Sequence, residues 1–160
     1  MKKILSYFFS IVIIIAIVYI GAVMIMGAYN LASGGGFACP SWPGCPDAPL
    51  PFLTGSRLHH VHWLHRLTVV AGLVAVALLA HRARAVRDAS PALAAGAVAL
   101  LSLYLLQAAL GAATIWSDFA SAVRSVHLLV GAAVWALAVA LLARAQYVPD
   151  AVAAGETSRT

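Results

Sequence analysis

Histidines are the residues of this chain whose types and spacing point most directly to chemistry. Five of the six lie at the start of, or inside, two long apolar segments: His59, His60, His62, His65 and His127. His62 and His65 are three residues apart, so a helix carries them on one face. The sixth, His81, lies among arginines, and we expect it to be solvated or to face lipid headgroups.

Two of these histidines are expected at matching depth in two membrane helices. His65 is followed directly by Arg66, and His127 lies one turn inside another apolar segment, after Arg124. Ionisable residues inside a membrane are costly and by default mark a functional site. A hydrogen bond to a carbonyl group or a headgroup would explain either histidine alone. The matched pair instead favours ligation of a metal or of haem iron.

Haem fits this residue set better than a bare metal ion. Zinc prefers a tetrahedral set that often includes cysteine or carboxylate, and the membrane-embedded part of the chain has no acidic residue outside Asp118, which lies in a short connection. Several histidines could bind copper or zinc, but nothing in the sequence brings three of them to one point. Haem iron needs only two axial ligands, which facing helices of a bundle provide. Gly72 and Gly131 would let a macrocycle lie against the backbone, although close helix packing explains such glycines equally well.

Cys39 and Cys45 form a second candidate pair, in a connection rich in proline and glycine. An extracytoplasmic compartment permits a disulfide, so the pair is either a loop staple or a redox-active pair. Five residues separate the two cysteines. The spacing is therefore not that of the Cys-x-x-Cys redox motif, and the general redox signal is weak.

Other polar residues are expected on the same side of the membrane as the histidines. Arg57, Arg66 and Arg124 could pair with porphyrin propionates, because arginine binds carboxylates through two parallel hydrogen bonds. Contact with lipid phosphate is the alternative. A third apolar segment carries Gln107, Gly111 and Thr114. These residues would contact a ligand or, more commonly, a neighbouring helix.

The composition indicates which elements hold these residues. The chain has 160 residues, of which 63% are apolar and 9% charged, and its mean hydropathy is +0.95. Soluble domains average roughly 45–50% apolar and about 25% charged residues. Four segments have the roughly 20 apolar residues that a membrane helix needs: 4–26, from 59–63 to 79, 91–115 and 123–142. We therefore predict an all-α integral membrane protein, an antiparallel four-helix transmembrane bundle over residues 1–147 with a disordered cytoplasmic tail over 148–160.

The lysines and arginines predict how the bundle is oriented. One side collects Lys2, Lys3, Arg82, Arg84, Arg87, Arg144 and Arg159, and the other collects Arg57, Arg66 and Arg124. The positive-inside rule places both termini in the cytoplasm and the long loop 29–58 outside, in a multi-pass protein of the cell membrane. This distribution also explains the net charge of +5 without a nucleic-acid partner. A cleaved signal peptide is the competing interpretation of segment 4–26, which is longer than the apolar core of about 7–15 residues in such peptides.

Several of these segments together resemble the heme A synthase family. Residues 33–45, Ser-Gly-Gly-Gly-Phe-Ala-Cys-Pro-Ser-Trp-Pro-Gly-Cys, are similar to the outer-loop signature of that family. The Gln-x-x-Leu-Gly-x-x-Thr pattern of 107–114 is similar to its third-helix segment. His65-Arg66 resembles its ligand motif, and His127 falls where its fourth-helix ligand would be. The resemblance covers about residues 4–142.

The resemblance implies an activity and a ligand set. The family oxidises the C8 methyl group of heme O to the formyl group of heme A, with a bound heme b as cofactor. It implies that His65 and His127 are axial ligands of haem iron and that Cys39 and Cys45 are the disulfide or thiol pair of the loop. It also implies an enzyme that supplies heme O and an electron donor, whose identity the sequence does not indicate.

Two departures from the family pattern shape the prediction. Typical members have eight transmembrane helices in two halves, each with a histidine pair, whereas this chain resembles one half. Holding both substrate and cofactor would then require a homo-oligomer, and closed symmetric assemblies are the usual solution. The family's substrate half usually has a glutamate three residues before the ligand, where this chain has His62. A neutral imidazole can accept a proton but stabilises positive charge less well, so His62 is the candidate catalytic residue.

Two alternative functions remain open from the sequence. A four-helix b-type cytochrome would bind haem through the same histidines and transfer electrons without oxygenase activity. A membrane thiol oxidase would use Cys39 and Cys45. That class generally needs more than one cysteine pair, and a thiol oxidase would leave His65 and His127 unexplained.

Overall fold

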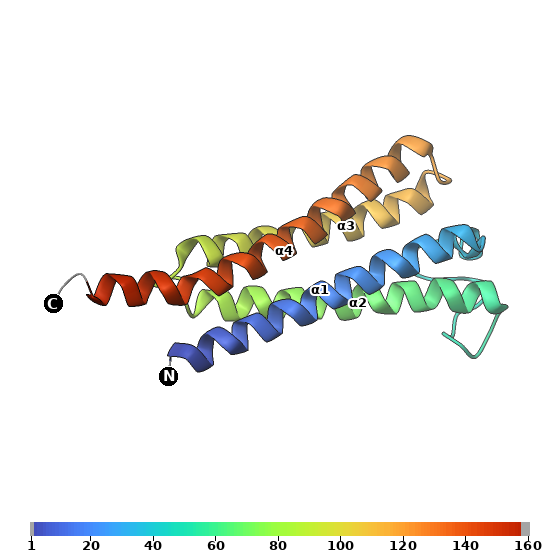
Figure 1. The fold of residues 1–160 in the computed structure, drawn as a ribbon. Coiled ribbons are helices and arrows are strands. Elements are labelled where there is room, and N and C mark those ends of the chain that lie inside the picture. The colour runs from blue at the N-terminus through green and yellow to red at the C-terminus, as the bar shows by residue number, and fades with distance from the viewer. Residues whose placement is uncertain (1, 158–160) are drawn as a thin grey trace.

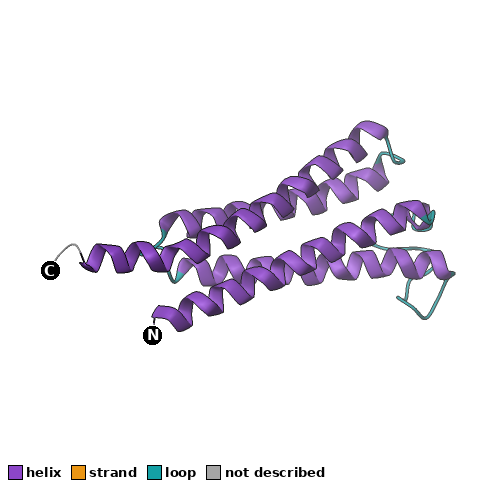
Figure 2. Ribbon diagram, in the orientation of Figure 1, coloured by secondary structure: helices purple, strands orange, loops and turns teal. Residues whose placement is uncertain are grey.

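The computed structural model of the chain describes residues 2–157, with side chains described for 10–145. This part contains four long helices, one short 3-10 turn and no strand: α1 (Lys2–Ala32), η1 (Gly35–Phe37), α2 (Arg57–Arg84), α3 (Pro91–Trp116) and α4 (Ser121–Thr157) (Figures 1 and 2). Each long helix has a stretch long and apolar enough to cross a membrane. The predicted all-helical architecture, with four helices long and apolar enough to span a membrane, is confirmed.

The helices extend beyond the apolar segments that predicted them. α1 continues to Ala32, after which Gly34 takes a left-handed conformation with φ of 80° that ends the helix. α2 begins after Ser56, whose backbone N–H donates to His59 Nδ1 at 3.0 Å in a capping box. α4 continues to Thr157, so residues 148–157 are helical where the composition predicted a disordered tail. Hydropathy detects only the apolar part of a helix, whereas the hydrogen-bonded backbone continues into polar sequence until a cap ends it.

The four long helices form a ring. α1 and α3 each contact α2 and α4, so α1 lies diagonally opposite α3, and α2 diagonally opposite α4. Figure 1 shows the free ends of α1 and α4 at one end of the bundle and the long α1–α2 connection at the other. We call the second end, formed by residues 33–56 and 117–120, the loop end.

The apolar core occupies the half of the bundle that is farther from the loop end. Ile13, Val76, Leu100 and Val134, one from each helix, are at most 1% exposed. On α2 the buried core residues begin at Val76, which is eleven residues, or about 16 Å, along the helix from His65. The half nearer the loop end instead buries polar side chains, namely Asn30, His62 and Thr114.

Aromatic contacts join the two connections at the loop end. The ring centroids of Phe37 and Phe119 are 4.3 Å apart, and those of Trp42 and Trp116 are 5.8 Å apart. Phe37 and Trp42 belong to the α1–α2 connection, and their partners lie at the end of α3 and just after it. These contacts tie the α1–α2 pair to the α3–α4 pair beside the polar interior.

Candidate functional site

His65 and His127 lie on the diagonal helices α2 and α4, and both side chains are partly buried. The Nδ1 atom of each ring is shielded from solvent and has no hydrogen-bond partner in the described part of the chain. Buried polar atoms without a partner are rare because they lose their hydration. The Nδ1 atoms of both histidines are therefore available to a ligand inside the bundle.

A glycine of the neighbouring helix lies against each of these rings. A Cβ atom on Gly27 of α1 would be 3.1 Å from Cε1 of His65. A Cβ atom on Gly111 of α3 would be 3.3 Å from Cε1 of His127. Both distances are shorter than ordinary van der Waals contacts. A larger residue at either position would therefore displace the adjacent histidine ring.

The two glycines that the sequence proposed as haem-facing lie against other side chains. A Cβ atom on Gly131 would be 2.8 Å from Nε2 of Gln107, so α3 and α4 approach closely there. Gly72 makes room for the hydroxyl group of Tyr104, which donates a hydrogen bond to the Val69 carbonyl at 2.9 Å. Gly72 thus serves packing between α2 and α3. Gly131 places the Gln107 amide one turn from His127, and Oε1 of that amide is buried without a partner.

His62 is the most buried of the six histidines, with 3% of its surface exposed. Its Nδ1 atom lies 2.9 Å from the carbonyl oxygen of Gly35 in η1. A neutral ring that donates from Nδ1 has Nε2 as its free acceptor. A Cβ atom at position 35 would be 2.5 Å from Oδ1 of Asn30 and 3.2 Å from the carbonyl oxygen of Leu58, so a larger residue there would displace the Asn30 amide. The turn after α1 therefore fixes the orientation of His62.

The remaining histidines have other partners. Nδ1 of His59 contacts both the backbone nitrogen and the hydroxyl group of Ser56 at 3.0 Å, which caps α2. Nε2 of His60 lies 3.2 Å from the Thr54 carbonyl oxygen, outside the bundle interior. His81 is exposed near the opposite end of α2. His62, His65 and His127 are thus the histidines that line the interior.

Arg66 holds the loop that contains the two cysteines. Its guanidinium group donates to three carbonyl oxygens at 2.6 to 2.8 Å: those of Ser41, Pro43 and Gly44. The group also lies 5.4 Å from the centre of the Trp63 ring. Arg66 was predicted to bind a propionate, but here its two terminal nitrogens are engaged by the loop. Its Nε atom is buried without a partner.

Cys39 and Cys45 form a disulfide in this loop. Both are buried, and they cluster with Ala48 against Trp63. The Trp63 indole N–H donates to the Ala48 carbonyl at 2.8 Å. The predicted disulfide is therefore present, and the loop that it closes is packed onto the first turns of α2.

The other two arginines at the loop end differ in their surroundings. Arg57 is exposed and donates to the Tyr29 hydroxyl group at 3.3 Å. Arg124 is half-buried one turn before His127, and its guanidinium group has no hydrogen bond or ion pair within the described residues. Arg124 is therefore the arginine near the histidine pair that remains able to bind an anionic group.

The bundle holds two imidazoles whose Nδ1 atoms have no partner among the described residues, on the diagonal helices α2 and α4. No group of three or more histidine, cysteine, aspartate or glutamate side chains gathers around one point in the described part of the chain. Haem iron needs two axial ligands and a flat space between them. His65 and His127, each in contact with a glycine of a neighbouring helix, are the two candidate ligands.

Sequence reasoning missed Gly27 and Asn30, which lie three residues apart on α1. Asn30 is 6% exposed, and its Oδ1 atom has no partner. The available signal was a glycine and an amide on one helical face of an otherwise apolar segment. Their relation to His65 and His62 depends on the register between α1 and α2, which the sequence of either segment alone does not specify.

Comparison with family models, curated proteins and solved structures found no match to this chain. The functional assignment therefore has to come from the residues of the site.

Proposed function

We propose that this protein is a haem-dependent membrane oxidoreductase that oxidises the C8 methyl group of heme O to the formyl group of heme A. The observation that carries the proposal is the diagonal pair of His65 and His127, each with a buried Nδ1 atom without a partner. Each ring also lies against a glycine of the neighbouring helix. These observations support haem ligation, and the reaction on heme O is what the resemblance of residues 33–45 and 107–114 to heme A synthases implies.

In this proposal His65 and His127 are the axial ligands of haem iron. Bound heme b supplies the redox chemistry. Arg124 pairs with a propionate, because it is half-buried one turn from His127. Gly131 keeps the α3–α4 contact close, and the Gln107 amide at that contact, one turn from His127, would be available to a bound haem.

His62 is the proposed catalytic residue. With dioxygen as the oxidant and the electron donor as the reductant, the balanced conversion is R–CH3 + 2 O2 + 4 e− + 4 H+ → R–CHO + 3 H2O. This conversion takes up protons, and a neutral imidazole can accept a proton at its free nitrogen and pass it on. The contact between Nδ1 of His62 and the Gly35 carbonyl leaves Nε2 for that role. Because His62 lies one turn before His65 on α2, its ring is on the face that carries the ligand.

The loop over residues 33–56 covers the site in this proposal. The Cys39–Cys45 disulfide and the three carbonyl bonds of Arg66 hold the loop against α2. A fixed cover excludes bulk water from the reacting group, which strengthens electrostatic interactions there. We assign Arg66 to this positioning role rather than to a propionate.

The proposal requires partners and an orientation. One histidine pair holds one haem, so substrate and cofactor together need at least two copies of the chain in a homo-oligomer. An enzyme that produces heme O and an electron donor are the other partners. The basic end of the bundle faces the cytoplasm of a cell-membrane protein, with both termini inside and the α1–α2 loop outside.

Extraction of haem from the purified protein tests this function. The protein is co-expressed with a heme O supply, and its haems are separated by chromatography and identified by mass. We expect heme A beside heme b, with heme A absent from the His62→Ala variant. If cells that lack this protein contain heme A at the same level, the protein is not the source of heme A and the proposed activity is wrong.

A b-type cytochrome is the second candidate function. The observation that favours it is the single histidine pair in a chain that has His62 where heme A synthases usually have a glutamate. This candidate predicts that only heme b is recovered from the same co-expression, even when an electron donor is supplied. Recovery of heme A would exclude it.

A further inference from the structure

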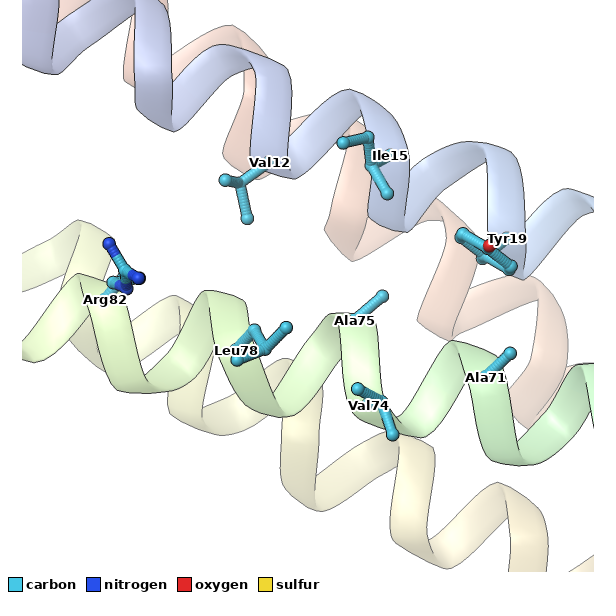
Figure 3. Close-up of a pocket in the computed structure, with 8 residues that line it drawn as sticks. All are labelled: Val12, Ile15, Tyr19, Ala71, Val74, Ala75, Leu78 and Arg82. Atoms are coloured by element: carbon cyan, nitrogen blue, oxygen red, sulfur yellow. The ribbon is translucent and has the colours of Figure 1, made fainter.

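An apolar groove lies between α1 and α2, in the half of the bundle away from the loop end. Its volume is about 410 Å³. Figure 3 shows its lining from both helices: Val12, Ile15, Tyr19, Ala71, Val74, Ala75, Leu78 and Arg82. Ala71 and Ala75 create the hollow because their side chains are small. The groove is open on the outside of the bundle, where Ile15, Val74 and Leu78 are 45 to 54% exposed.

The groove has the length of one membrane leaflet. Ala71 and Arg82 are eleven residues apart on α2, which corresponds to about 16 Å along the helix. Half of a hydrocarbon core of roughly 30 Å is about 15 Å. Arg82 thus lies at the level of the headgroups when Ala71 lies near the bilayer midplane. A single extended acyl chain matches a groove of this length and apolar lining.

The positive charge at the open end of the groove favours a lipid with an anionic headgroup. Arg82 is the one charged residue of the lining, and Figure 3 shows its guanidinium group at one end of the row of apolar side chains. Arg84 and Arg87 follow on the same side of the bundle. Asp88, the acidic residue of the α2–α3 connection, is exposed and lies 3.7 Å from Nε of Arg87. Anionic headgroups gain free energy from such basic clusters at a membrane surface.

We propose that this groove is a binding site for an anionic phospholipid, with one acyl chain between α1 and α2 and the phosphate group on Arg82. Phosphate oxygens accept hydrogen bonds from the planar guanidinium group. The site is separate from the histidine pair, because Tyr19 and Ala71 at its inner end are eight and six residues from Gly27 and His65. The proposal does not depend on the haem chemistry.

Lipid binding to the detergent-purified protein tests the proposal. Phosphatidylglycerol and phosphatidylcholine with identical acyl chains are titrated, and bound lipid is counted by native mass spectrometry. We expect the wild-type protein to bind phosphatidylglycerol more tightly. Arg82→Gln should weaken that binding about fivefold, the effect of one basic residue near an anionic surface. It should weaken the binding of phosphatidylcholine less, because the choline cation of that lipid offsets the charge of its phosphate group. Ala75→Leu fills the hollow and should weaken the binding of both lipids.

Two matched variants control for general effects of charge and size. Arg87→Gln removes a charge at the same end outside the groove, and Ala95→Leu adds the same side chain on an exposed position of α3. Ala95→Leu should bind lipid as the wild type does. Arg87→Gln, whose charge belongs to the basic cluster but lies outside the groove, should weaken phosphatidylglycerol binding less than Arg82→Gln does. Helical content and monodisperse elution confirm that each variant is folded. Equal affinity of the wild type for the two lipids, or equal effects of Arg82→Gln and Arg87→Gln, would overturn the proposal. Unchanged binding in folded Ala75→Leu would do the same.

Discussion

His62 and Gly35 join the interior of the bundle to the turn that follows α1, through a 2.9 Å contact between Nδ1 and the carbonyl oxygen. The contact spans 27 residues of sequence and involves a side chain that is 3% exposed. A histidine held at one nitrogen by a backbone group has a fixed ring orientation and a defined free nitrogen. This contact distinguishes His62 from a histidine that only fills space between helices.

Replacement of His62 should separate haem binding from haem conversion. In the His62→Ala variant we expect haem to remain bound at His65 and His127, while heme A formation falls by about 100-fold or more, the usual effect of losing a positioned acid–base group. Chromatography of extracted haem measures both quantities. The matched control is His60→Ala, since His60 bonds to the Thr54 carbonyl at the start of the same helix. Unchanged conversion in His62→Ala would remove His62 from the mechanism.

Gly27 should be needed for the position of the His65 ring. A leucine at residue 27 would meet Cε1 of His65, since a Cβ atom alone would be 3.1 Å away. Overpacking of this kind costs about 1–3 kcal/mol, so we expect haem affinity to fall about tenfold or more. Gly21→Leu is the control on the same helix, because a Cβ atom there meets nothing within 4 Å. Equal haem affinity in the two variants would show that Gly27 does not shape the site.

Arg66 should stabilise the disulfide loop through the hydrogen bonds that the two terminal nitrogens of its guanidinium group donate. Lysine keeps the charge but has one terminal nitrogen, so Arg66→Lys cannot reach the three carbonyl oxygens that arginine bonds. We expect a loss of about 2–3 kcal/mol in stability, which lowers the midpoint of thermal unfolding. Arg57→Lys, at an exposed arginine with one long hydrogen bond, should leave the midpoint unchanged. If Arg66→Lys and Arg57→Lys unfold at the same midpoint temperature, Arg66 does not stabilise the disulfide loop.

The disulfide should contribute to stability through the short loop that it closes. Cys39 and Cys45 are six residues apart, and closure of a loop of this size is worth about 2 kcal/mol in the chain-entropy model. We therefore expect Cys39→Ala/Cys45→Ala to unfold at a lower temperature than the wild type. Added reductant should lower the midpoint of the wild type and leave that of the variant unchanged. An effect of reductant on the variant would assign the change to something other than this bond.

Much of the fold could be predicted from the sequence because bilayer thickness constrains each helix separately. Apolar runs such as 91–115 match α3 (Pro91–Trp116) closely. Caps set the true ends elsewhere, as Ser56 and His59 do for α2, and hydropathy does not detect them. Segment 148–157 was assigned to a disordered tail on composition, whereas α4 continues through it.

The site was predicted less completely, because contacts between helices depend on their relative register. The types and depth of His65 and His127 were visible in the sequence. That Gly27 and Gly111 lie against those rings, whereas Gly72 lies against Tyr104, follows only from how the helices pack. The engagement of Arg66 by the loop was equally hidden, since its partners are backbone carbonyls of residues 22 to 25 positions earlier.

Haem binding by single-ligand variants tests the central claim most directly. The purified wild type, His65→Ala, His127→Ala and His81→Ala are titrated with haem and followed by absorption spectroscopy. We expect one haem per chain with a low-spin, bis-histidine spectrum in the wild type and in His81→Ala, whose histidine is exposed at the far end of α2. That spectrum should be lost in both ligand variants. Stoichiometric haem with an unchanged spectrum in both His65→Ala and His127→Ala would contradict the account.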